Sequence, residues 1–383
     1  MDFDLNDEQR QLKDSVERLL ADTHGDLAKR AAYMKEPQGY SQAVWKRYAE
    51  LGLLAVPFAE EHGGLGQGPT ETMIIAEALG RALAIEPYFA TVVLSGGALR
   101  HAGNALLLRE LVAPIVEGKL ILALAHQERQ ARYDLADTAT TARADGKGGY
   151  TLEGEKCVVL HGDCANKLIV TARANGARAE RSGIGLFVVD DTASGLTRRG
   201  YMTQDGMRAA DVTLSAVRVG PEAVLADPDR GLEVLDRVVD EAIAALSAEA
   251  VGAMAALNEL TVDYLKTRKQ FGVPIGSFQV LQHRAVDMFT ALEQARSMAY
   301  YATMMVAEPN AVARRKAIAA TKVQIGRSAR YVGQEAIQLH GGIGMTMEYK
   351  AGHYFKRLTM IDMAFGDADH HLRELAKGGR SAE

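Results

Sequence analysis

Apolar residues recur at helical intervals near the start of the chain. Asn6 is followed three residues later by Gln9, which is the arrangement of a capping box at a helix N-terminus. The apolar positions that follow keep helical spacing: Leu12, Val16, Leu19 and Leu20. We therefore predict that roughly the first 115 residues are mainly helical. The segment EEHGGLGQGP (60–69) lacks the Lys-Ser/Thr pair and the preceding strand of a phosphate-binding loop, so we interpret it as a connecting loop.

The pattern changes between about Leu120 and Val219. Short runs rich in β-branched residues alternate there with clusters of Gly, Asp and Asn. The runs are KCVVL, KLIVTA, GLFVVD and DVTLSAVRV. This alternation is typical of strands separated by turns and predicts an all-β segment.

Helical patterns return after Pro228. In residues 280–308, small and apolar residues repeat every seven positions in two adjacent rows. The rows are Leu281, Met288, Ala295 and Ala302, with Ala285, Leu292 and Ala299 beside them. Such rows form the seam of an antiparallel helix bundle, so the chain is predicted to be helical, then β, then helical.

Composition and charge narrow the class of protein. A chain of 383 residues is too long for one ordinary core and is expected to form two or three packed units. The net charge of -5, with both signs spread along the chain, excludes nucleic acid and anionic membranes as expected partners. The start, MDFDLNDEQR, is acidic where a signal peptide is basic, and no long uncharged apolar run follows. We expect a cytoplasmic protein.

Two clusters of reactive residue types need an interpretation. Cys157 and Cys164 flank a histidine and an aspartate, which suggests a nucleophilic site, but the segment is better interpreted as a strand ending in a Gly162-Asp163 turn. In MIDMAFGDADHHL (360–372), Asp367 is expected to be a helix N-cap. Asp369 would then lie in the first turn, and His371 could pair with Asp367 on one helix face. No metal site is expected, because the spacing matches no known metal motif.

Two further motifs near the C-terminus are suited to holding a pyrophosphate and an adenosine. The first, TRKQFGVPIGSFQVLQ (267–282), supplies Arg268, Phe271 and Gln279. The second, QLHGGIGM (338–345), supplies Gln338, Gly341 and Gly342. Arginine and amide side chains donate hydrogen bonds to phosphate and base, and glycines allow close backbone approach. The alternative is that Arg268 only caps a helix and the glycines only make a turn.

In this order, within a chain that is helical, then β, then helical, the motifs resemble the acyl-CoA dehydrogenase family. The resemblance covers essentially the whole chain and includes PFAEEHGGLG, YTLEGEKCVVLHGDCANKLIV and AEAVGAM. It implies an acyl-CoA dehydrogenase-like fold with an N-terminal all-α domain (1–118), a middle β-barrel-like or β-sandwich domain (119–225) and a C-terminal four-helix bundle (226–383).

The resemblance also implies FAD as the cofactor and a dimer of dimers with FAD between subunits. Six residues would hold the ADP half of a neighbour's FAD: Arg268, Phe271, Gln279, Gln338, Gly341 and Gly342. In this family a Glu carboxylate removes the α-proton of an acyl-CoA thioester while hydride leaves the β-carbon for the flavin. Electron-transferring flavoprotein is the expected electron acceptor.

The chain departs from the family at the catalytic base. An ungapped match forward from QLHGGIG puts Phe365 where the family has its glutamate, and phenylalanine cannot accept a proton. Some relatives carry the base on an earlier helix, but the matching position here is Ala242. Glu241 lies one position away, about 100° around the helix, and remains an alternative base, as does Asp367.

The flavin-facing residues of the family are replaced too. Val158 and Leu160 stand where the family has a Trp and a Thr, and Gln127 and Tyr133 stand at its Thr and Ser places. The residues that would face this chain's own flavin are therefore changed, whereas those that would reach a neighbour's FAD remain. Among members of the family, the chain is most similar to the small, base-lacking subunit of pimeloyl-CoA dehydrogenase and to similar subunits of heteromeric enzymes for dicarboxylic or steroid acyl-CoA.

Three hypotheses follow. The first is a base-lacking subunit of a heterotetramer whose partner chain carries the glutamate. The second is a self-sufficient homomeric acyl-CoA dehydrogenase that uses Glu241 or Asp367 as its base. The third is a CoA-thioester-binding scaffold without a redox role.

Overall fold

The capping box predicted at Asn6 begins the first helix, α1 (Asp7–His24). The side chain of Asn6 accepts the backbone N–H of Gln9 at 2.8 Å, and the side chain of Gln9 accepts the backbone N–H of Asn6 at 3.0 Å. Val16, Leu19 and Leu20 are buried, as their spacing predicts.

The structure is a computed structural model that describes residues 5–380. The first four residues of the acidic start, 1–4, lie outside the described residues.

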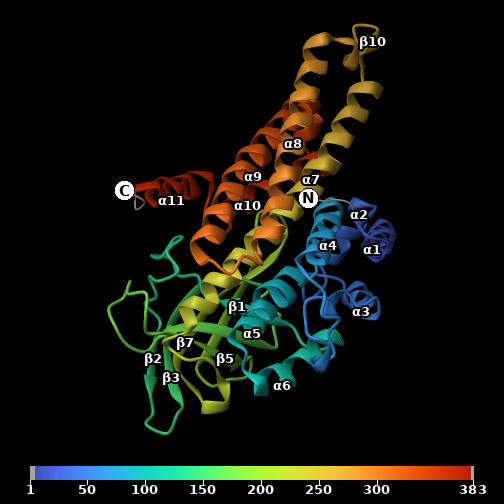
Figure 1. The fold of residues 1–383 in the computed structure, drawn as a ribbon. Helices are drawn as coiled ribbons and strands as arrows, with labels where there is room; N and C mark the ends of the chain where they lie inside the picture. The colour runs from blue at the N-terminus through green and yellow to red at the C-terminus, as the bar shows by residue number, and fades with distance from the viewer. Residues whose placement is uncertain (1–4, 381–383) are drawn as a thin grey trace. The chain divides into compact units, whose positions relative to one another are not determined.

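Helices occupy both ends of the chain, as the periodicity predicts (Figure 1). After α1, the helices of the N-terminal part are α2 (Leu27–Tyr33), α3 (Gln42–Glu50), α4 (Pro69–Ala82), a π-helix (Phe89–Ser95), α5 (Gly96–Ala102) and α6 (Ala105–Val116). Those of the C-terminal part are α7 (Gly231–Thr267), α8 (Gln279–Met305), α9 (Ala311–His340), α10 (Lys350–Met363) and α11 (Ala368–Arg380). The segment 60–69 contains only a short 3-10 turn before α4, so the predicted connecting loop is confirmed.

The predicted β-segment is confirmed and forms one eight-stranded sheet. The strands are β1 (Leu122–Ala125), β2 (Thr141–Ala144), β3 (Tyr150–Leu160), β4 (Lys167–Arg173), β5 (Ile184–Asp190), β6 (Leu196–Met202), β7 (Arg208–Val219) and β8 (Val224–Ala226). The order is β6-β7-β3-β2-β4-β5-β8, with β1 paired to β4 in parallel. The pairing of β3 with β7 shifts register between Lys156 and Val159, which marks a bulge at residues 157 and 158.

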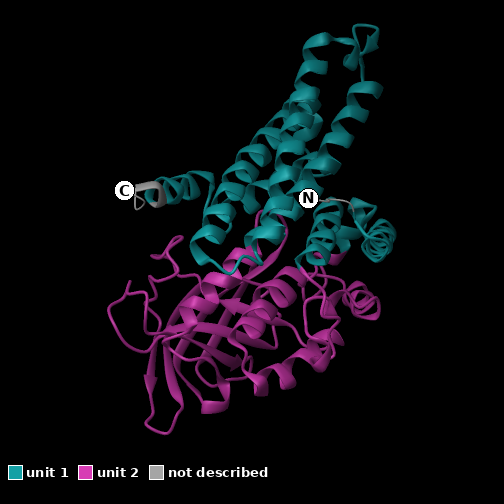
Figure 2. Ribbon diagram, viewed as in Figure 1, with its two compact units in different colours: residues 1–32, 69–84, 243–383 teal, residues 33–68, 85–242 magenta. Residues whose placement is uncertain are grey.

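The chain divides into two compact units (Figure 2). Unit 1 comprises residues 1–32, 69–84 and 243–383 and is helical. Unit 2 comprises residues 33–68 and 85–242 and contains the eight-stranded sheet. Helices of the N-terminal part belong to both units, so the units do not coincide with the three predicted domains. The exact boundaries of those domains remain predictions.

The helical seam predicted on α8 is largely confirmed. Met288, Leu292, Ala295, Ala299 and Ala302 are buried. The two positions nearest the start of the helix, Leu281 and Ala285, are only half-buried. Small residues along the seam allow neighbouring helices to approach closely, which is the packing expected in a helix bundle.

Two glycines control how closely α4 and α7 pack within unit 1. A Cβ atom at Gly80 would collide with the backbone carbonyl of Glu249, and a Cβ atom at Gly252 would collide with that of Glu77. Each helix therefore offers a glycine to the backbone of the other. Any larger residue at either position forces the helices apart.

We expect Gly252→Ala to lower the free energy of unfolding by about 1–3 kcal/mol, because overpacking outweighs the gain in helix propensity. Gly97→Ala in α5 is the matched control, because a Cβ there would find its nearest neighbours at an ordinary 3.5 Å. Chemical denaturation of both variants checks this. Equal stability of the Gly252→Ala variant and the unsubstituted protein would show that the close crossing is not needed.

Candidate functional site

The first predicted motif forms the hairpin that joins α7 to α8. The N–H of Arg268 donates to the carbonyl of Tyr264 at 2.8 Å, which closes the last turn of α7. Two short strands follow, β9 (Lys269–Gln270) and β10 (Val273–Pro274). The two residues between them, Phe271 and Gly272, have φ angles of 54° and 82°, which are the left-handed values that a tight two-residue hairpin turn needs.

The side chains of this motif face away from the chain that carries them. Phe271 is 93% exposed, and its ring meets that of Phe278 edge to face. Arg268 and Gln279 are also exposed, and within the described residues neither side chain makes a hydrogen bond. Arg268 does close the helix end, as the alternative holds, but through its backbone N–H. A binding role for its guanidinium remains a prediction.

The second predicted motif lies at the same end of the bundle. α9 ends at His340, whose ring packs against Tyr264 (4.6 Å between centroids) and Tyr349 (5.0 Å). Because Tyr264 lies one turn before Arg268, this packing brings the GGIG loop and the hairpin to the same end. Gly341 has a φ of 63° and continues into a 3-10 turn that ends at Met345.

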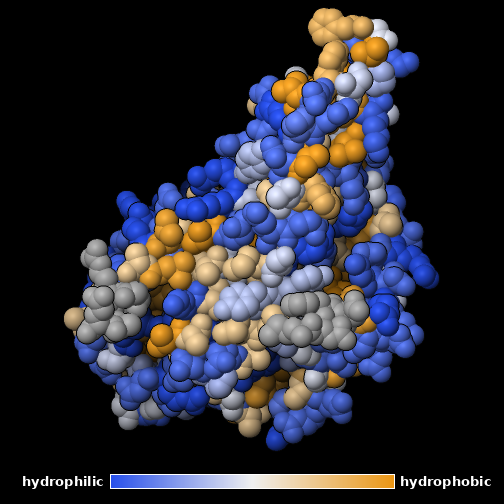
Figure 3. Space-filling view, turned by 45° about the horizontal axis from the view of Figure 1, so that its top comes forward, coloured by the Kyte–Doolittle hydropathy of each residue, from blue (hydrophilic) through white to orange (hydrophobic). Residues whose placement is uncertain are grey.

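The glycine loop has an open face. A Cβ atom built at Gly341 or Gly342 would meet nothing within 4 Å, so the backbone there is accessible to a ligand or another chain. The side chain of Gln338 is exposed beside it. Hydrophobic side chains are exposed on the same unit, as the orange atoms in the upper part of Figure 3 show. They include Phe271, Val280, Val286 and Phe289.

We call Arg268, Phe271, Gln279, Gln338, Gly341 and Gly342 the clamp. Its groups fit the ADP half of FAD: an unpaired guanidinium for the pyrophosphate, two amides for hydrogen bonds, an aromatic ring for stacking and two glycines that let the backbone approach. These groups point outward from the chain, so a ligand held by them would extend beyond this chain.

The position predicted for the base lies in the turn between α10 and α11. Phe365 has a φ of 56° and is followed by Gly366 at 104°. The carbonyl of Phe365 accepts a hydrogen bond from Nε2 of His371 at 2.9 Å. Burial lowers the pKa of His371 to about 4, so the ring is neutral and Nε2 carries its proton. Lys322 donates to the carbonyls of residues 361 and 362, which fixes the end of α10.

Asp367 and His371 of GDADHH make hydrogen bonds that stabilise this turn. The side chain of Asp367 accepts the N–H of His370 at 2.7 Å, so the predicted N-cap is confirmed. The pairing of His371 with Asp367 is wrong, because the imidazole bonds the carbonyl of Phe365 instead. Among the described residues, no three of His, Cys, Asp and Glu gather as metal ligands would.

Glu241, the alternative base, is held by an arginine and a histidine. Its carboxylate accepts from Arg100 at 2.7 Å and contacts Nε2 of His101 at 2.8 Å. Burial opposes its ionisation, but the hydrogen bond from His101 and the charge of Arg100 outweigh burial and lower the pKa of Glu241 to about 2. A carboxylate with so low a pKa is a weak base. Ala242, at the matching position, is fully buried and carries no polar side chain.

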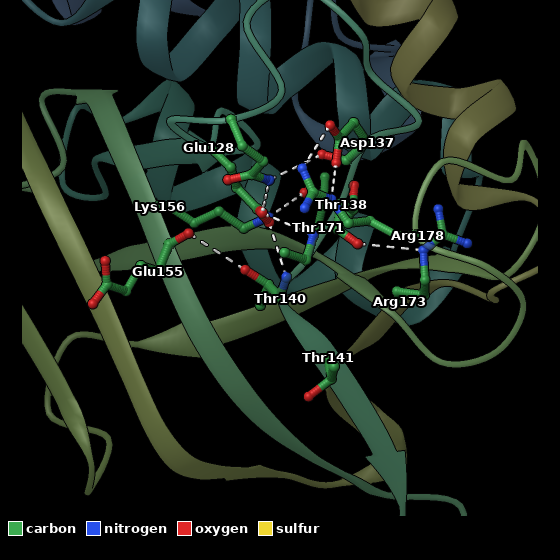
Figure 4. Close-up of polar contacts among 12 residues, drawn as sticks. Glu128, Asp137, Thr138, Thr140, Thr141, Glu155, Lys156, Thr171, Arg173 and Arg178 are labelled. Carbon is green, nitrogen blue, oxygen red and sulfur yellow. Dashed lines mark hydrogen bonds and ion pairs between the residues drawn. The ribbon is translucent and has the colours of Figure 1, made fainter.

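A buried ion pair joins the sheet to the loop between β1 and β2 (Figure 4). Nζ of Lys156 in β3 donates to Glu128 at 2.6 Å and to the hydroxyl of Thr171 at 2.8 Å. Glu128 also accepts the backbone N–H groups of Ala139 (2.8 Å) and Thr140 (3.1 Å). One carboxylate thus closes the loop between β1 and β2 and ties it to β3.

The loop closed by Glu128 is also held at its far end. The guanidinium of Arg173 donates to five backbone carbonyls, two of which, those of Ala136 and Thr138, belong to the loop. Arg178 forms a two-bond fork with Asp137. The loop that carries Gln127 and Tyr133 is therefore anchored by Glu128, Arg173 and Arg178.

Two of the positions predicted to face a flavin, 127 and 158, lie next to or near this ion pair in the chain. Val158 occupies the bulge of β3 with a φ of 51°, and its N–H donates to the hydroxyl of Tyr201 at 3.2 Å. The carbonyl of Gln127 accepts the N–H of Cys157 at 2.9 Å, which joins the loop to β3. Valine and leucine at 158 and 160 offer neither an aromatic surface nor a hydroxyl.

The cysteines do not form a nucleophilic site. Cys164 lies in the turn after β3, 3.9 Å from Nδ1 of His161, which confirms the predicted turn. Burial, together with the charge of Asp163, raises the pKa of Cys164 to about 12, so it remains a thiol. Burial likewise raises the pKa of Cys157. A thiol that does not ionise near neutral pH is a poor nucleophile.

Family comparisons match nearly all of the chain. The N-terminal, middle and C-terminal domains of acyl-CoA dehydrogenase match residues 6–119, 123–217 and 229–379. The chain belongs to the acyl-CoA dehydrogenase family. It is therefore an oxidoreductase acting on acyl-CoA, and its cofactor is FAD.

Several relatives are similar over nearly their full length. Acyl-CoA dehydrogenase IpdE2 of Mycobacterium tuberculosis is 31% identical over 92% of this chain and 91% of its own. The structure of a variant of the Tcur3481-Tcur3483 steroid ACAD is 29% identical, with a TM-score of 0.87 over 98% of both chains. The FAD complex of PigA is 26% identical, with a TM-score of 0.90 over 100% of both chains.

No helix among the described residues is long and apolar enough to span a membrane.

Sequence analysis missed the ion pair between Glu128 and Lys156. The available signal was a lysine inside an apolar strand, in GEKCVVL, where strand alternation directs it inward. A buried lysine requires a charged partner, but the partner lies 28 residues away and no local pattern identifies it.

We expect Lys156→Met to lower the free energy of unfolding by about 3–5 kcal/mol at pH 7, because Glu128 would remain buried and unpaired. Burial alone would raise the pKa of Glu128, but Lys156 outweighs it and lowers that pKa from 4.5 to about 2. The pair's stabilisation is therefore full above pH ~5 and is lost as the pH falls through about 2, so the difference between variant and unsubstituted protein should shrink in acid.

Denaturation at several pH values measures this difference. Lys167→Met is the control, because its pair with Asp190 lies at the surface, where such pairs contribute about 0–1 kcal/mol. A loss for Lys156→Met no larger than that of the control would contradict a structural role for the buried pair.

Proposed function

We propose that this chain is the base-lacking subunit of a heterotetrameric, FAD-dependent acyl-CoA dehydrogenase. Its clamp holds the ADP half of an FAD whose flavin lies in a partner chain, and that partner carries the catalytic glutamate. The observation that carries the proposal is the contrast between an exposed clamp and a base position filled by Phe365.

The contrast has a physical reading. Arg268 and Gln279 are exposed polar side chains with no hydrogen bond in the described part of the chain, and Phe271 is almost wholly exposed. Exposed aromatic and arginine side chains are typical of residues that a partner or ligand covers. On the sheet, the flavin-facing positions carry Val158 and Leu160, which give up stacking and hydrogen bonding.

The residues of this chain have separable roles in such an enzyme. Arg268 would donate to the pyrophosphate, and Gln279 and Gln338 would donate or accept beside it, while Gly341 and Gly342 leave room for the nucleotide. FAD, when bound, supplies the acceptor for the hydride of acyl-CoA dehydrogenation. The N–H of Phe365 could donate to a thioester oxygen, because a backbone group does not depend on the side chain, but this residue cannot remove a proton.

The substrate class is narrower than acyl-CoA in general. The related Tcur3481-Tcur3483 structure is a steroid ACAD, and its paired name supports a heteromeric assembly for relatives of this chain. We therefore infer an acyl-CoA thioester derived from a steroid, with dicarboxylic acyl-CoA as the alternative. Electron-transferring flavoprotein is the proposed electron acceptor.

We expect the isolated chain to purify with little FAD and no acyl-CoA dehydrogenase activity. Co-expression with a glutamate-bearing acyl-CoA dehydrogenase should give a heteromer with both. FAD per chain, from absorbance after denaturation, and turnover with an artificial acceptor measure this. Full FAD and robust activity in the isolated chain would refute the heteromeric assignment.

We expect Arg268→Gln in the heteromer to weaken FAD binding by roughly 10- to 100-fold, the effect of losing one hydrogen bond to a charged group. Arg109→Gln on α6 is the matched control, because that arginine is also exposed. FAD affinity is measured by titrating the apo-heteromer. If both variants bind FAD equally well, the clamp assignment fails.

The self-sufficient alternative is tested at Glu241. Because the charge of Arg100 neutralises this carboxylate and His101 bonds it, we expect Glu241→Gln to lower stability by about 1–3 kcal/mol and to leave heteromer turnover within about twofold. Thermal unfolding and steady-state kinetics separate the two effects. A loss of turnover of ~100-fold or more in a variant that remains folded would identify Glu241 as the base.

A further inference from the structure

A hollow lies on the sheet of unit 2 and is lined by residues of β3, β6 and β7. It has a volume of about 360 Å³, which is within the range of small-molecule pockets. Its lining includes Thr197 of β6 and Thr213 of β7, which are paired across the two strands. Neither Val158 nor Leu160 lines it, and it shares no residue with the clamp. We call it the arginine hollow.

Two arginines converge at one side of the arginine hollow. Nη2 of Arg129 and Nη2 of Arg199 donate to the same oxygen of Asp211, at 2.9 and 2.7 Å. The other oxygen of Asp211 accepts from the hydroxyl of Tyr201 at 3.2 Å. One carboxylate oxygen therefore serves two guanidiniums, and each guanidinium keeps further N–H groups that no hydrogen bond in the described residues uses.

The lining carries charges of both signs. Four cationic and two acidic side chains border the arginine hollow, in a chain whose net charge is -5. Lys156 is neutralised from behind by Glu128, and Arg198 donates to two backbone carbonyls. The remaining donors are therefore Arg129 and Arg199, opposed by Asp211 and by the exposed Glu155.

The donor set selects a chemical class of ligand. Guanidiniums match the geometry of phosphate oxygens, and the hydroxyls of Thr197 and Thr213 make no hydrogen bond within the described residues. A doubly charged phosphate offers enough oxygens for both arginines and both hydroxyls, whereas a carboxylate offers two. We propose that the arginine hollow binds the phosphate group of a small anionic ligand, held by Arg129 and Arg199. This site is independent of the proposed clamp for FAD.

The test measures binding to the full chain without partner or FAD. Inorganic phosphate and ADP are titrated separately by calorimetry at low ionic strength, with acetate as a carboxylate control. Binding of both phosphate and ADP shows that the phosphate alone is recognised, and binding of ADP only shows that a nucleotide carries it. Equal affinity for acetate, or no binding of either probe, would overturn the proposal.

Substitutions show which residues bind the phosphate and whether each one favours or opposes binding. Arg129→Gln and Arg199→Gln should each weaken binding by about tenfold or more, through loss of a charge-assisted hydrogen bond. Asp211→Asn should strengthen it by roughly tenfold, because it removes a competing negative charge. If the three residues only formed a structural ion-pair cluster, the arginine variants and Asp211→Asn would not change phosphate affinity in opposite directions. Weaker or unchanged binding in Asp211→Asn therefore counts against the proposal.

Two controls distinguish this site from the clamp. Arg143→Gln removes an exposed arginine from β2, in the same unit, and should leave binding unchanged. Arg268→Gln removes the clamp arginine. ADP binding that is lost in Arg268→Gln but kept in Arg129→Gln belongs to the clamp and overturns the arginine hollow as its site. ADP binding that is kept in Arg268→Gln but lost in Arg129→Gln supports the arginine hollow. This conclusion holds even if the proposed heteromeric assembly is wrong.

Discussion

The buried contact between Glu128 and Lys156 is the interaction on which the β-part of this protein depends. Taking two charges out of water is costly unless their remaining hydrogen-bonding groups are satisfied. Here the carboxylate also accepts two backbone N–H groups, and the ammonium also donates to Thr171. The pair therefore fixes the loop between β1 and β2, the bulge of β3 and the strand β4 in one arrangement.

This arrangement explains how flavin-facing residues can change while the fold persists. The backbone of the loop is held by Glu128 at one end and by Arg173 at the other, which are residues other than the replaced ones. The same holds for Val158, whose bulge is fixed by the hydroxyl of Tyr201. The residues that hold the loop and the bulge differ from those predicted to contact the flavin. The predicted contact residues can therefore be replaced while the fold is kept.

The same separation appears in the helical unit. The turn that carries Phe365 is fixed by His371, Lys322 and the N-cap Asp367, none of which depends on the identity of residue 365. A phenylalanine at the position predicted for the base is therefore compatible with the turn, and under the proposed function this chain does not abstract the proton. In the clamp, by contrast, the side chains of Arg268, Gln279 and Gln338 are exposed, so the proposed cofactor role uses groups that the core of this unit does not bury.

The sequence by itself determined the order of helical and β-segments, the helix caps at Asn6 and Asp367 and the family, because these depend on local spacing and short motifs. It also predicted the loss of the base at Phe365, from a match forward from QLHGGIG without a gap, and that prediction stays untested. It did not reveal that Glu128 pairs with Lys156, that His371 bonds Phe365 instead of Asp367, or that Arg100 and His101 hold Glu241. Those contacts join residues that are distant in the chain or compete with an equally plausible local partner. Only the packed backbone decides which acceptor a buried donor reaches.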